Sequence, residues 1–292
     1  MTRRVALLGK PLRRRHSVVM HNAAFEAAGI DARYVLMEIE PEAVAGAVAA
    51  ARGSDWLGLG VTAPYKRVVA ELCDEVEPDA IAIGAVNNVV RTGEGRLVGF
   101  NSDAPGFRAG VELALGRPLA GLDVVVAGAG GAAHAVVHAL VTAGARHVTI
   151  GNRTAAAAAA LAERFGGLGG LGGLGGLGGV AGVGLDDPAF VEALRSADLA
   201  VNATTVGMVD PGVTIAVDEL PDAATVFDLV YVPPETPLLR AARERGLATA
   251  NGAEMLIAQA AIAFERWTGV GGMAGVMRAA VAPLLADPGV RA

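Results

Sequence analysis

Lys66 is the residue whose type first suggests chemistry. The chain has 22 arginines and only two lysines, Lys10 and Lys66, so arginine supplies almost every positive charge. Arginine keeps its proton near neutral pH, whereas a lysine whose pKa is lowered can release it. A lysine retained against this bias indicates a position where arginine will not serve, and we interpret Lys66 as a candidate for proton transfer.

Further polar residues follow the ends of neighbouring predicted strands. In an open α/β sheet such positions converge on one crevice, where ligands bind. A lysine and a carboxylate that meet there would form an acid–base pair, and amides and hydroxyls beside them would orient a polyol. The residues concerned are Thr62, Lys66, Asn87, Asn88, Asn101, Ser102 and Asp103.

A glycine-rich turn between a strand and a helix is the strongest local signal. Residues 124–136 read VVVAGAGGAAHAV, in which Gly128, Gly130 and Ala133 fit the pattern G-x-G-x-x-A. Gly128 permits a tight turn, Gly130 lets the backbone approach a pyrophosphate, and Ala133 lets the helix pack closely on the strand. The free N–H groups of the helix then face the phosphates. The pattern predicts a dinucleotide site, with a purely structural turn as the alternative.

The end of the next strand indicates which dinucleotide binds. An NAD site usually places Asp or Glu there, to hold the ribose 2′-hydroxyl. This chain has Gly151-Asn152-Arg153-Thr154 and no acid. The Arg153 guanidinium suits a 2′-phosphate and Thr154 offers a hydroxyl and a helix N-cap, so NADP is favoured. An ordinary capped turn is the alternative interpretation.

Short apolar strands alternate with helical patterns, which predicts a mostly parallel α/β fold. The segments 86–91 and 96–100, joined by Thr92-Gly93-Glu94-Gly95, predict a hairpin. A second α/β unit is expected to begin near Asp103. The tract GGLGGLGGLGGLGG at 166–179 is too rich in glycine for a helix or stable strand, so we expect a flexible surface loop there.

Composition narrows the classes of protein that remain. With 53% hydrophobic and 18% charged residues the chain is not disordered, and its apolar stretches are too short to span a membrane. The net charge of -6 argues against a nucleic-acid partner. Cys73 is the only cysteine, so no internal disulfide forms and the cytoplasm is the expected location. The five histidines show no ligand spacing, and no metal site is expected.

Ordered motifs over most of the chain resemble the shikimate dehydrogenase family. The N-terminal motifs are Gly9-Lys10-Pro11, Ser17, His21-Asn22-Ala23-Ala24-Phe25, Val61-Thr62-Ala63-Pro64-Tyr65-Lys66, Gly84-Ala85-Val86-Asn87 and Gly99-Phe100-Asn101-Ser102-Asp103. The later motifs are the Gly128 turn, Asn152-Arg153-Thr154, Asn202-Ala203-Thr204, Asp228-Leu229-Val230-Tyr231 and Gly252-Ala253-Glu254-Met255-Leu256 with Gln259.

The resemblance implies a two-domain α/β protein. Residues 1–103 and 252–292 would form an N-terminal, mostly parallel substrate-binding and catalytic domain, and residues 104–251 a Rossmann-type NADP-binding domain. The implied reaction is the reversible NADP-dependent reduction of 3-dehydroshikimate to shikimate. The sequence leaves the state of assembly undecided, with a homodimer as one alternative.

The resemblance also implies the roles of individual residues. Lys66 and Asp103 would be the catalytic pair. The substrate, a small cyclic hydroxy-acid, would be bound by Arg15, Ser17, Thr62, Asn87, Tyr231 and Gln259. The cofactor would be bound by Gly128, Ala129, Gly130, Gly131, Ala132, Asn152, Arg153, Thr154, Thr204, Val230, Gly252 and Met255.

Several positions depart from the pattern usual in this family. Arg15 stands where the first of two serines normally helps to hold the substrate carboxylate, and Val18 replaces a proline. Asn88 and Ser102 each stand where threonine is usual, and the second arginine expected after Arg153 is missing. These differences bear on the choice of substrate more than on the chemistry.

The departures leave other functions open. A paralogue acting on quinate or an amino-shikimate is the first alternative, and a ligand-sensing homologue without turnover is the second. Retention of both Lys66 and Asp103 favours catalysis, because a protein that only binds has no need of the pair. A folate-type dehydrogenase of similar build would not need Asn101-Ser102-Asp103 together with Gln259.

Overall fold

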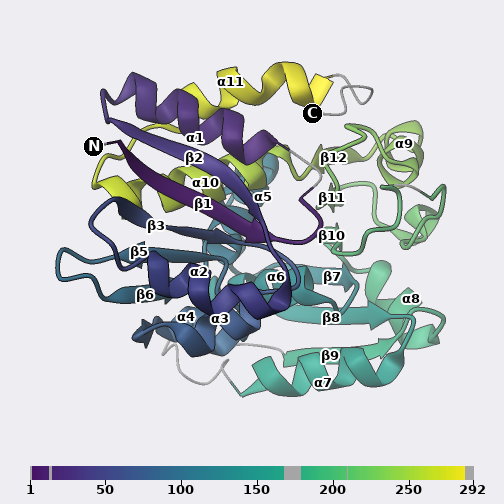
Figure 1. Cartoon of the computed structure of the whole chain (residues 1–292). Helices are drawn as coiled ribbons and strands as arrows, with labels where there is room; N and C mark the ends of the chain where they lie inside the picture. The colour runs from purple at the N-terminus through teal and green to yellow at the C-terminus, as the bar shows by residue number, and fades with distance from the viewer. Residues whose placement is uncertain (1, 13–14, 168–178, 209, 287–292) are drawn as a thin grey trace. The chain divides into compact units, whose positions relative to one another are not determined.

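The computed structural model describes residues 2–12, 15–167, 179–208 and 210–286. It divides into two compact units, Met1–Gly106 with Ile257–Ala292, and Phe107–Leu256. Two helices, α5 (Asp103–Leu115) and α10 (Ala253–Thr268), carry the chain between the units (Figure 1). No helix in the described ranges is long and apolar enough to cross a lipid bilayer.

The first unit is built on a six-stranded mixed sheet. Along the sheet the strands are β2 (Ala32–Glu38), β1 (Arg3–Gly9), β3 (Trp56–Val61), β5 (Asn88–Arg91), β6 (Leu97–Phe100) and β4 (Glu75–Val76). All neighbours are parallel except β5, which is antiparallel to both β3 and β6. The predicted hairpin is therefore confirmed. It places the residues just before β5 beside those just after β6.

Helices cover both faces of this sheet, which explains why every residue of β3 is buried. On one face, Val44 and Val48 of α2 (Val44–Ala50), Val69 of α3 (Lys66–Leu72) and Ala80 of α4 (Pro78–Ile83) share a core with β1 and β3. On the other face lie α1 (His16–Ala27), α10 and α11 (Ala274–Ala286), with α1 and α11 side by side (Figure 1).

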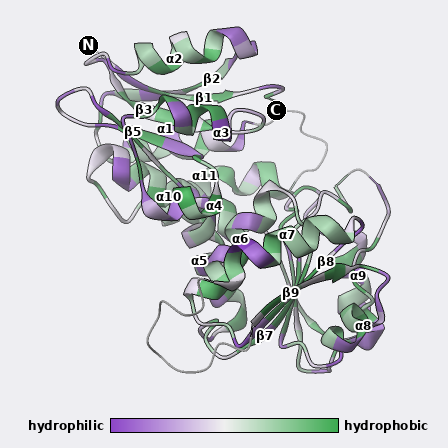
Figure 2. Ribbon diagram, turned by 90° about the horizontal axis from the view of Figure 1, so that it is seen from below, coloured by the Kyte–Doolittle hydropathy of each residue, from purple (hydrophilic) through white to green (hydrophobic). Residues whose placement is uncertain are grey.

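The second unit has a six-stranded, wholly parallel sheet. Its order is β12 (Ala248–Asn251), β11 (Thr225–Asp228), β10 (Leu199–Asn202), β7 (Asp123–Ala127), β8 (His147–Asn152) and β9 (Gly179–Gly184). The helices between the strands are α6 (Gly131–Thr142), α7 (Ala155–Gly166), α8 (Pro188–Leu194) and α9 (Pro237–Glu244). Numbered from β7, this is the strand order 6-5-4-1-2-3 of the Rossmann fold, as predicted. Figure 2 shows the strands around β7 and β8 as strongly hydrophobic, which suits a sheet buried on both faces.

The glycine–leucine tract is only partly visible. Gly166 ends α7 and Gly179 begins β9, so these two positions do not belong to a loop as expected. Gly167 is the C-cap residue of α7, and residues 168–178 of the predicted loop lie outside the described residues.

Candidate active site

Lys66 and Asp103 meet in the first unit although 37 residues separate them in sequence. Lys66 is the first residue of α3, and Asp103 is the first residue of α5. The Lys66 Nζ donates to Asp103 Oδ2 at 2.6 Å, and the two side chains are 31% and 13% exposed. The helix dipole of α5 favours the Asp103 carboxylate at its first turn. The pair is therefore sheltered but still open to a ligand.

A buried polar network adjoins this pair. Asn87 and Ser102 are brought together by the antiparallel register of β5 and β6, and the Ser102 N–H donates to Asn87 Oδ1 at 2.8 Å. Asn88 donates from Nδ2 to Asn87 Oδ1 at 2.9 Å and to Ser102 Oγ at 2.8 Å. Asn101 Oδ1 accepts from the Asp103 N–H at 2.9 Å, which fixes the start of α5.

Gln259 reaches the same helix from the C-terminal segment. At Gly106, one turn after Asp103, a Cβ atom would lie 2.8 Å from the Gln259 Cβ and 3.0 Å from its backbone nitrogen. Glycine thus lets α5 and α10 approach closely, and Gln259 lies beside α5 one turn from the carboxylate. Thr62, half-buried directly after β3, is held by its N–H, which donates to the Leu8 carbonyl at 2.8 Å.

Ser17 and Arg15 differ in their surroundings. Ser17 is half-buried in the first turn of α1, and its hydroxyl hydrogen-bonds the phenol of Tyr34. Burial raises the pKa of Tyr34 above its ordinary value, so the phenol stays neutral. Arg15 is exposed at the N-cap of α1, and within the described part of the chain its side chain has no hydrogen bond or ion pair. The structure brings Tyr34 to Ser17, a contact that sequence analysis missed because nothing marked that strand tyrosine.

In the second unit, the turn after β7 has the geometry that the glycine pattern predicts. Gly128 has φ +114°, and a Cβ there would lie 2.8 Å from Thr204 Cγ2 and 3.1 Å from the Ala203 carbonyl oxygen. A side chain is excluded on both counts. Gly130, Gly131 and Ala132 are exposed at the start of α6, so their N–H groups are available to an anion.

The end of β8 carries an exposed arginine and no carboxylate. Arg153 and Thr154 are exposed, and Asn152 Nδ2 donates to the Thr154 carbonyl at 3.1 Å. Thr154 is the N-cap residue of α7, as predicted, but its hydroxyl makes no capping hydrogen bond. The hydroxyl and the guanidinium are thus both accessible beside the Gly128 turn, as a site for a 2′-phosphate requires.

A second buried network fixes the loops after β10 and β11. Asn202 Nδ2 donates to Asp228 Oδ1 at 2.9 Å, and Thr204 Oγ1 donates to Asn202 Oδ1 at 2.7 Å. Asp228 also accepts from the Val230 N–H at 3.0 Å and from Thr236 Oγ1 at 2.7 Å. Burial raises the pKa of Asp228, although each of these donors opposes that rise. In the sequence Asp228 stands out only as part of a motif, and its position at the centre of this network is seen only in the structure.

The remaining predicted residues of this unit lie around that network. Tyr231 is half-buried, and Val230 is buried. The Gly252 N–H donates to the Val230 carbonyl at 3.4 Å. Met255 lies where α10 crosses α5, because a Cβ on Gly110 would come within 2.7 Å of its backbone nitrogen. All of these residues follow the carboxyl ends of the strands, the edge of a parallel sheet at which ligands bind.

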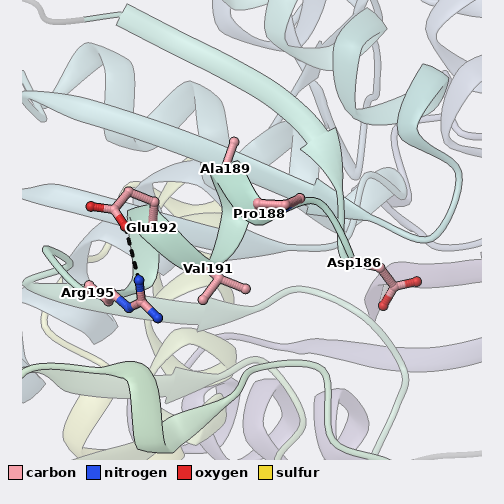
Figure 3. A pocket seen from close by; sticks show the side chains of 6 residues that line it. All are labelled: Asp186, Pro188, Ala189, Val191, Glu192 and Arg195. Carbon is pink, nitrogen blue, oxygen red and sulfur yellow. Dashed lines mark hydrogen bonds and ion pairs between the residues drawn. The ribbon is translucent and has the colours of Figure 1, made fainter.

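A hollow beside α8 lies apart from the residues of this site. Its volume is about 570 Å³, and it is lined by Asp186, Pro188, Ala189, Val191, Glu192 and Arg195, with an ion pair of 3.2 Å between Glu192 and Arg195 (Figure 3). None of the predicted site residues lines it. Within the described residues, no group of three or more His, Cys, Asp or Glu side chains is placed to hold a metal ion.

Comparison with known proteins agrees with this geometry. Three family models match the chain: the shikimate dehydrogenase substrate binding domain over residues 7–89, shikimate/quinate 5-dehydrogenase over 112–169, and the shikimate 5′-dehydrogenase C-terminal domain over 252–282. The shikimate dehydrogenase (NADP(+)) of Methanopyrus kandleri is 41% identical over 280 residues, which are 95% of this chain and 94% of the relative.

Solved structures extend the similarity to the fold. Shikimate 5-dehydrogenase from Thermus thermophilus, in complex with NADP(H) and shikimate, is 37% identical with a TM-score of 0.83, covering 96% of this chain and 99% of that one. Quinate dehydrogenase from Corynebacterium glutamicum, in complex with NAD, is 34% identical with a TM-score of 0.86, covering 97% and 99%. By sequence, fold and motif order, this chain belongs to the shikimate dehydrogenase family.

Proposed function

We propose that the protein catalyses the reversible reduction of 3-dehydroshikimate to shikimate with NADPH. The observation that carries this proposal is the 2.6 Å pair of Lys66 and Asp103 beside amide and hydroxyl groups suited to a polyol. Membership of the family and the relatives named as NADP-dependent shikimate dehydrogenases support the same reaction. A protein that only senses a ligand would have no use for this acid–base pair, so turnover is favoured over binding alone.

The two units have separate roles in this proposal. The first unit binds the substrate, and Ser17, Thr62, Asn87 and Gln259 contact its polar groups, with Arg15 as a further contact. Tyr231, which belongs to the second unit, is proposed as a substrate contact as well. The second unit binds the cofactor through the turn after β7 and through Arg153. The Gly128 turn fits a pyrophosphate because open space lies where a Cβ of Gly130 or Gly131 would stand, and the end of β8 lacks the carboxylate that NAD sites use.

The cofactor set follows from these elements. Gly128, Ala129, Gly130, Gly131 and Ala132 lie along the phosphates, Asn152, Arg153 and Thr154 surround the 2′-phosphate, and Thr204, Val230, Gly252 and Met255 line the remainder. Asp228 and Asn202 hold Thr204 and Val230 in place through the hydrogen bonds given above.

Lys66 supplies the proton in the reductive direction. NADPH, when bound by the second unit, would supply a hydride for the ketone carbon, and negative charge would develop on the ketone oxygen. The Lys66 ammonium stabilises that charge and donates a proton to the oxygen, which yields the hydroxyl. Asp103 holds the ammonium by the 2.6 Å hydrogen bond and accepts a hydrogen bond from a substrate hydroxyl. In the reverse direction the same lysine, once neutral, removes the hydroxyl proton.

A substrate and cofactor panel tests the proposal. Shikimate, quinate and an amino-shikimate are each assayed with NADP and with NAD, and reduction is followed at the nicotinamide absorption band. The expected result is the highest kcat/KM with shikimate and NADP. A higher kcat/KM with quinate would assign the protein to the quinate branch of the family, and no turnover with any acid would refute catalysis.

Two further expectations concern the state of assembly and the cellular location. We expect a homodimer, which light scattering of the purified protein tests. We expect a cytoplasmic location, which cell fractionation tests.

A further inference from the structure

Asn88 is a buried residue beside the proposed site that the reaction scheme does not use. It begins β5 and is 6% exposed. Its amide nitrogen donates two hydrogen bonds, at 2.9 Å to Asn87 Oδ1 and at 2.8 Å to Ser102 Oγ. Its two partners stand immediately before Asn88 and immediately before Asp103, so it connects the two segments that contribute to the site.

The backbone of Ser102 fixes the direction of every hydrogen bond in this group. The Ser102 N–H donates at 2.8 Å to the Asn87 amide, and a backbone N–H can only donate. The Asn87 atom that receives it must be Oδ1. The Asn88 atom facing that oxygen must then be the nitrogen, since two amide oxygens would repel each other. The orientation of both amides therefore follows from one backbone donor.

This arrangement leaves unused donor hydrogens on Asn87 and Ser102. Asn87 Oδ1 already accepts two hydrogen bonds, and Ser102 Oγ accepts from Asn88 Nδ2 and, at 3.2 Å, from Asn87 Nδ2. With both lone pairs of its oxygen engaged, the Ser102 hydroxyl must direct its own hydrogen elsewhere. Asn87 Nδ2 likewise retains a second hydrogen. The acceptor next to these donors is Asp103, the residue after Ser102.

We propose that Asn88 is a positioning residue that holds Asn87 and Ser102 as hydrogen-bond donors beside the acceptor Asp103. The ligand group that fits is a secondary hydroxyl, which donates to the carboxylate and accepts from the amide and the serine. This proposal rests on the proposed function, because the hydroxyl belongs to the cyclic hydroxy-acid substrate. It makes Asn88 a determinant of how tightly a ring hydroxyl is recognised.

The chemistry of the side chain explains why threonine would not replace it fully. An amide nitrogen carries two hydrogens and can serve Asn87 and Ser102 together, whereas a threonine hydroxyl carries one. Ser102, which accepts a hydrogen bond from Asn88, is 1% exposed, so there is little room for the added methyl group of a threonine at position 102. The two residues thus act as a matched pair.

Two variants of the full-length enzyme test the proposal. Asn88→Asp replaces the donor nitrogen with an oxygen, which repels Asn87 Oδ1 and draws the Ser102 hydrogen toward itself. We expect KM for shikimate to rise about 10- to 100-fold, the range for lost hydrogen bonds to one polar group, with KM for NADP within about twofold of the wild type. Asn88→Thr keeps one donor, and its KM for shikimate should fall between the two.

A substrate analogue separates positioning from general destabilisation. Each variant is assayed with shikimate and with analogues that each lack one ring hydroxyl. The penalty of Asn88→Asp should disappear with the analogue that lacks the hydroxyl held by Asn87 and Asp103. Arg91→Ala is the matched control, because it removes hydrogen bonds to the Arg52 and Thr92 carbonyls at the other end of the same strand. It should lower Tm and leave KM unchanged.

The outcomes for the two proposals are distinct. Wild-type turnover of shikimate tests the proposed function, and the ratio of variant to wild-type KM for whichever acid is turned over tests Asn88. An unchanged KM in a folded Asn88→Asp protein overturns the inference. So does a penalty that is equal for all analogues and follows Tm. If Asn88→Asp does not fold, Asn88→Thr tests the inference. Its KM for shikimate should exceed that of the wild type, and this increase should disappear with the analogue that lacks the recognised hydroxyl.

Discussion

The Lys66 ammonium and the Asp103 carboxylate begin two different helices of one unit and meet at 2.6 Å. Their positions depend on the sheet, since Lys66 follows β3 while Asp103 follows β6, and β5 lies between those strands. An ammonium held by a carboxylate is oriented toward the site, where it can protonate a ketone oxygen. Removing either side chain should therefore lower kcat more than it changes the Kd for NADP.

Lys66→Ala and Asp103→Ala should each lower kcat by about 10²-fold or more, the range for a positioned acid–base group. Both residues belong to the first unit and the Gly128 turn to the second, so the Kd for NADP should change little. Lys10→Ala is the control, because Lys10 is the other lysine and its ion pair is with Glu40. Near-wild-type rates for both site variants would show that the acid–base assignment is wrong.

Arg153→Ala should weaken NADP binding by about 10- to 100-fold, since a charge-assisted hydrogen bond contributes about 1.5–3 kcal/mol. NAD lacks the 2′-phosphate, and its Kd should stay nearly the same. Arg146→Ala is the matched control, because Arg146 lies beside the opposite end of β8 and forms an ion pair with Asp123. Titration of each variant with both cofactors gives the answer. An equal loss for NADP and NAD would indicate a structural role for Arg153.

Arg15→Ser should raise kcat/KM for shikimate by up to about 10-fold. The Arg15 side chain is exposed and, among the described residues, unpaired, so in the proposed function the half-buried Ser17 would hold the substrate carboxylate without it. A second serine adds one neutral hydrogen bond to that carboxylate, which contributes about 0.5–1.5 kcal/mol. In the wild type we expect kcat/KM for shikimate to be low, although higher than the values for quinate and the amino-shikimate.

The control for that variant is Arg33→Ser, which removes the same charge from an exposed position on β2. It should leave the ratio of kcat/KM values across the panel of acids unchanged. If Arg15→Ser leaves that ratio unchanged as well, and the wild type already prefers shikimate, Arg15 has no part in substrate choice.

His21 should make the protein less stable in mild acid. Its ring is buried and stacks on Tyr34 at 4.5 Å between ring centroids, and burial lowers its pKa from 6.5 to about 3. The unfolded chain takes up this proton near pH 6.5 while the folded protein does not. The stabilising contribution of the neutral ring is therefore full above pH 6.5 and is lost as the pH falls toward 3, by about 1.4 kcal/mol per pH unit.

Urea denaturation at several pH values measures this dependence. His21→Phe keeps an aromatic ring in the stack but has no proton to bind. The free energy of unfolding of the variant should fall less steeply between pH 6 and pH 4 than that of the wild type. Parallel curves for the two proteins would show that His21 does not contribute to the acid sensitivity.

Short elements were the part of the fold that local sequence patterns did not reveal. The helices α3, α4 and α8 have six or seven residues each, too few for a clear helical period, and they form because their apolar residues pack on a sheet. The edge strand β9 reads GVAGVG, a poor strand sequence. Its Gly182 lies directly against the Ala158 carbonyl of α7, a close approach that only glycine permits.

The sequence alone determined the fold class, the family, the preference for NADP and the residues that are candidates for the site. These follow from residue types at fixed spacing in short motifs along the chain, such as the strand–turn–helix segment around Gly128, where neighbours in sequence are neighbours in space. Only the tertiary structure decided the 2.6 Å contact of Lys66 with Asp103 and the hydrogen bonds of Asn88, because these join strands through sheet order and register. The sequence does not show which atoms of Asn87, Asn88 and Ser102 donate hydrogen bonds and which accept them. In the structure the Ser102 backbone N–H makes Asn87 Oδ1 an acceptor, and the direction of the other hydrogen bonds follows from that.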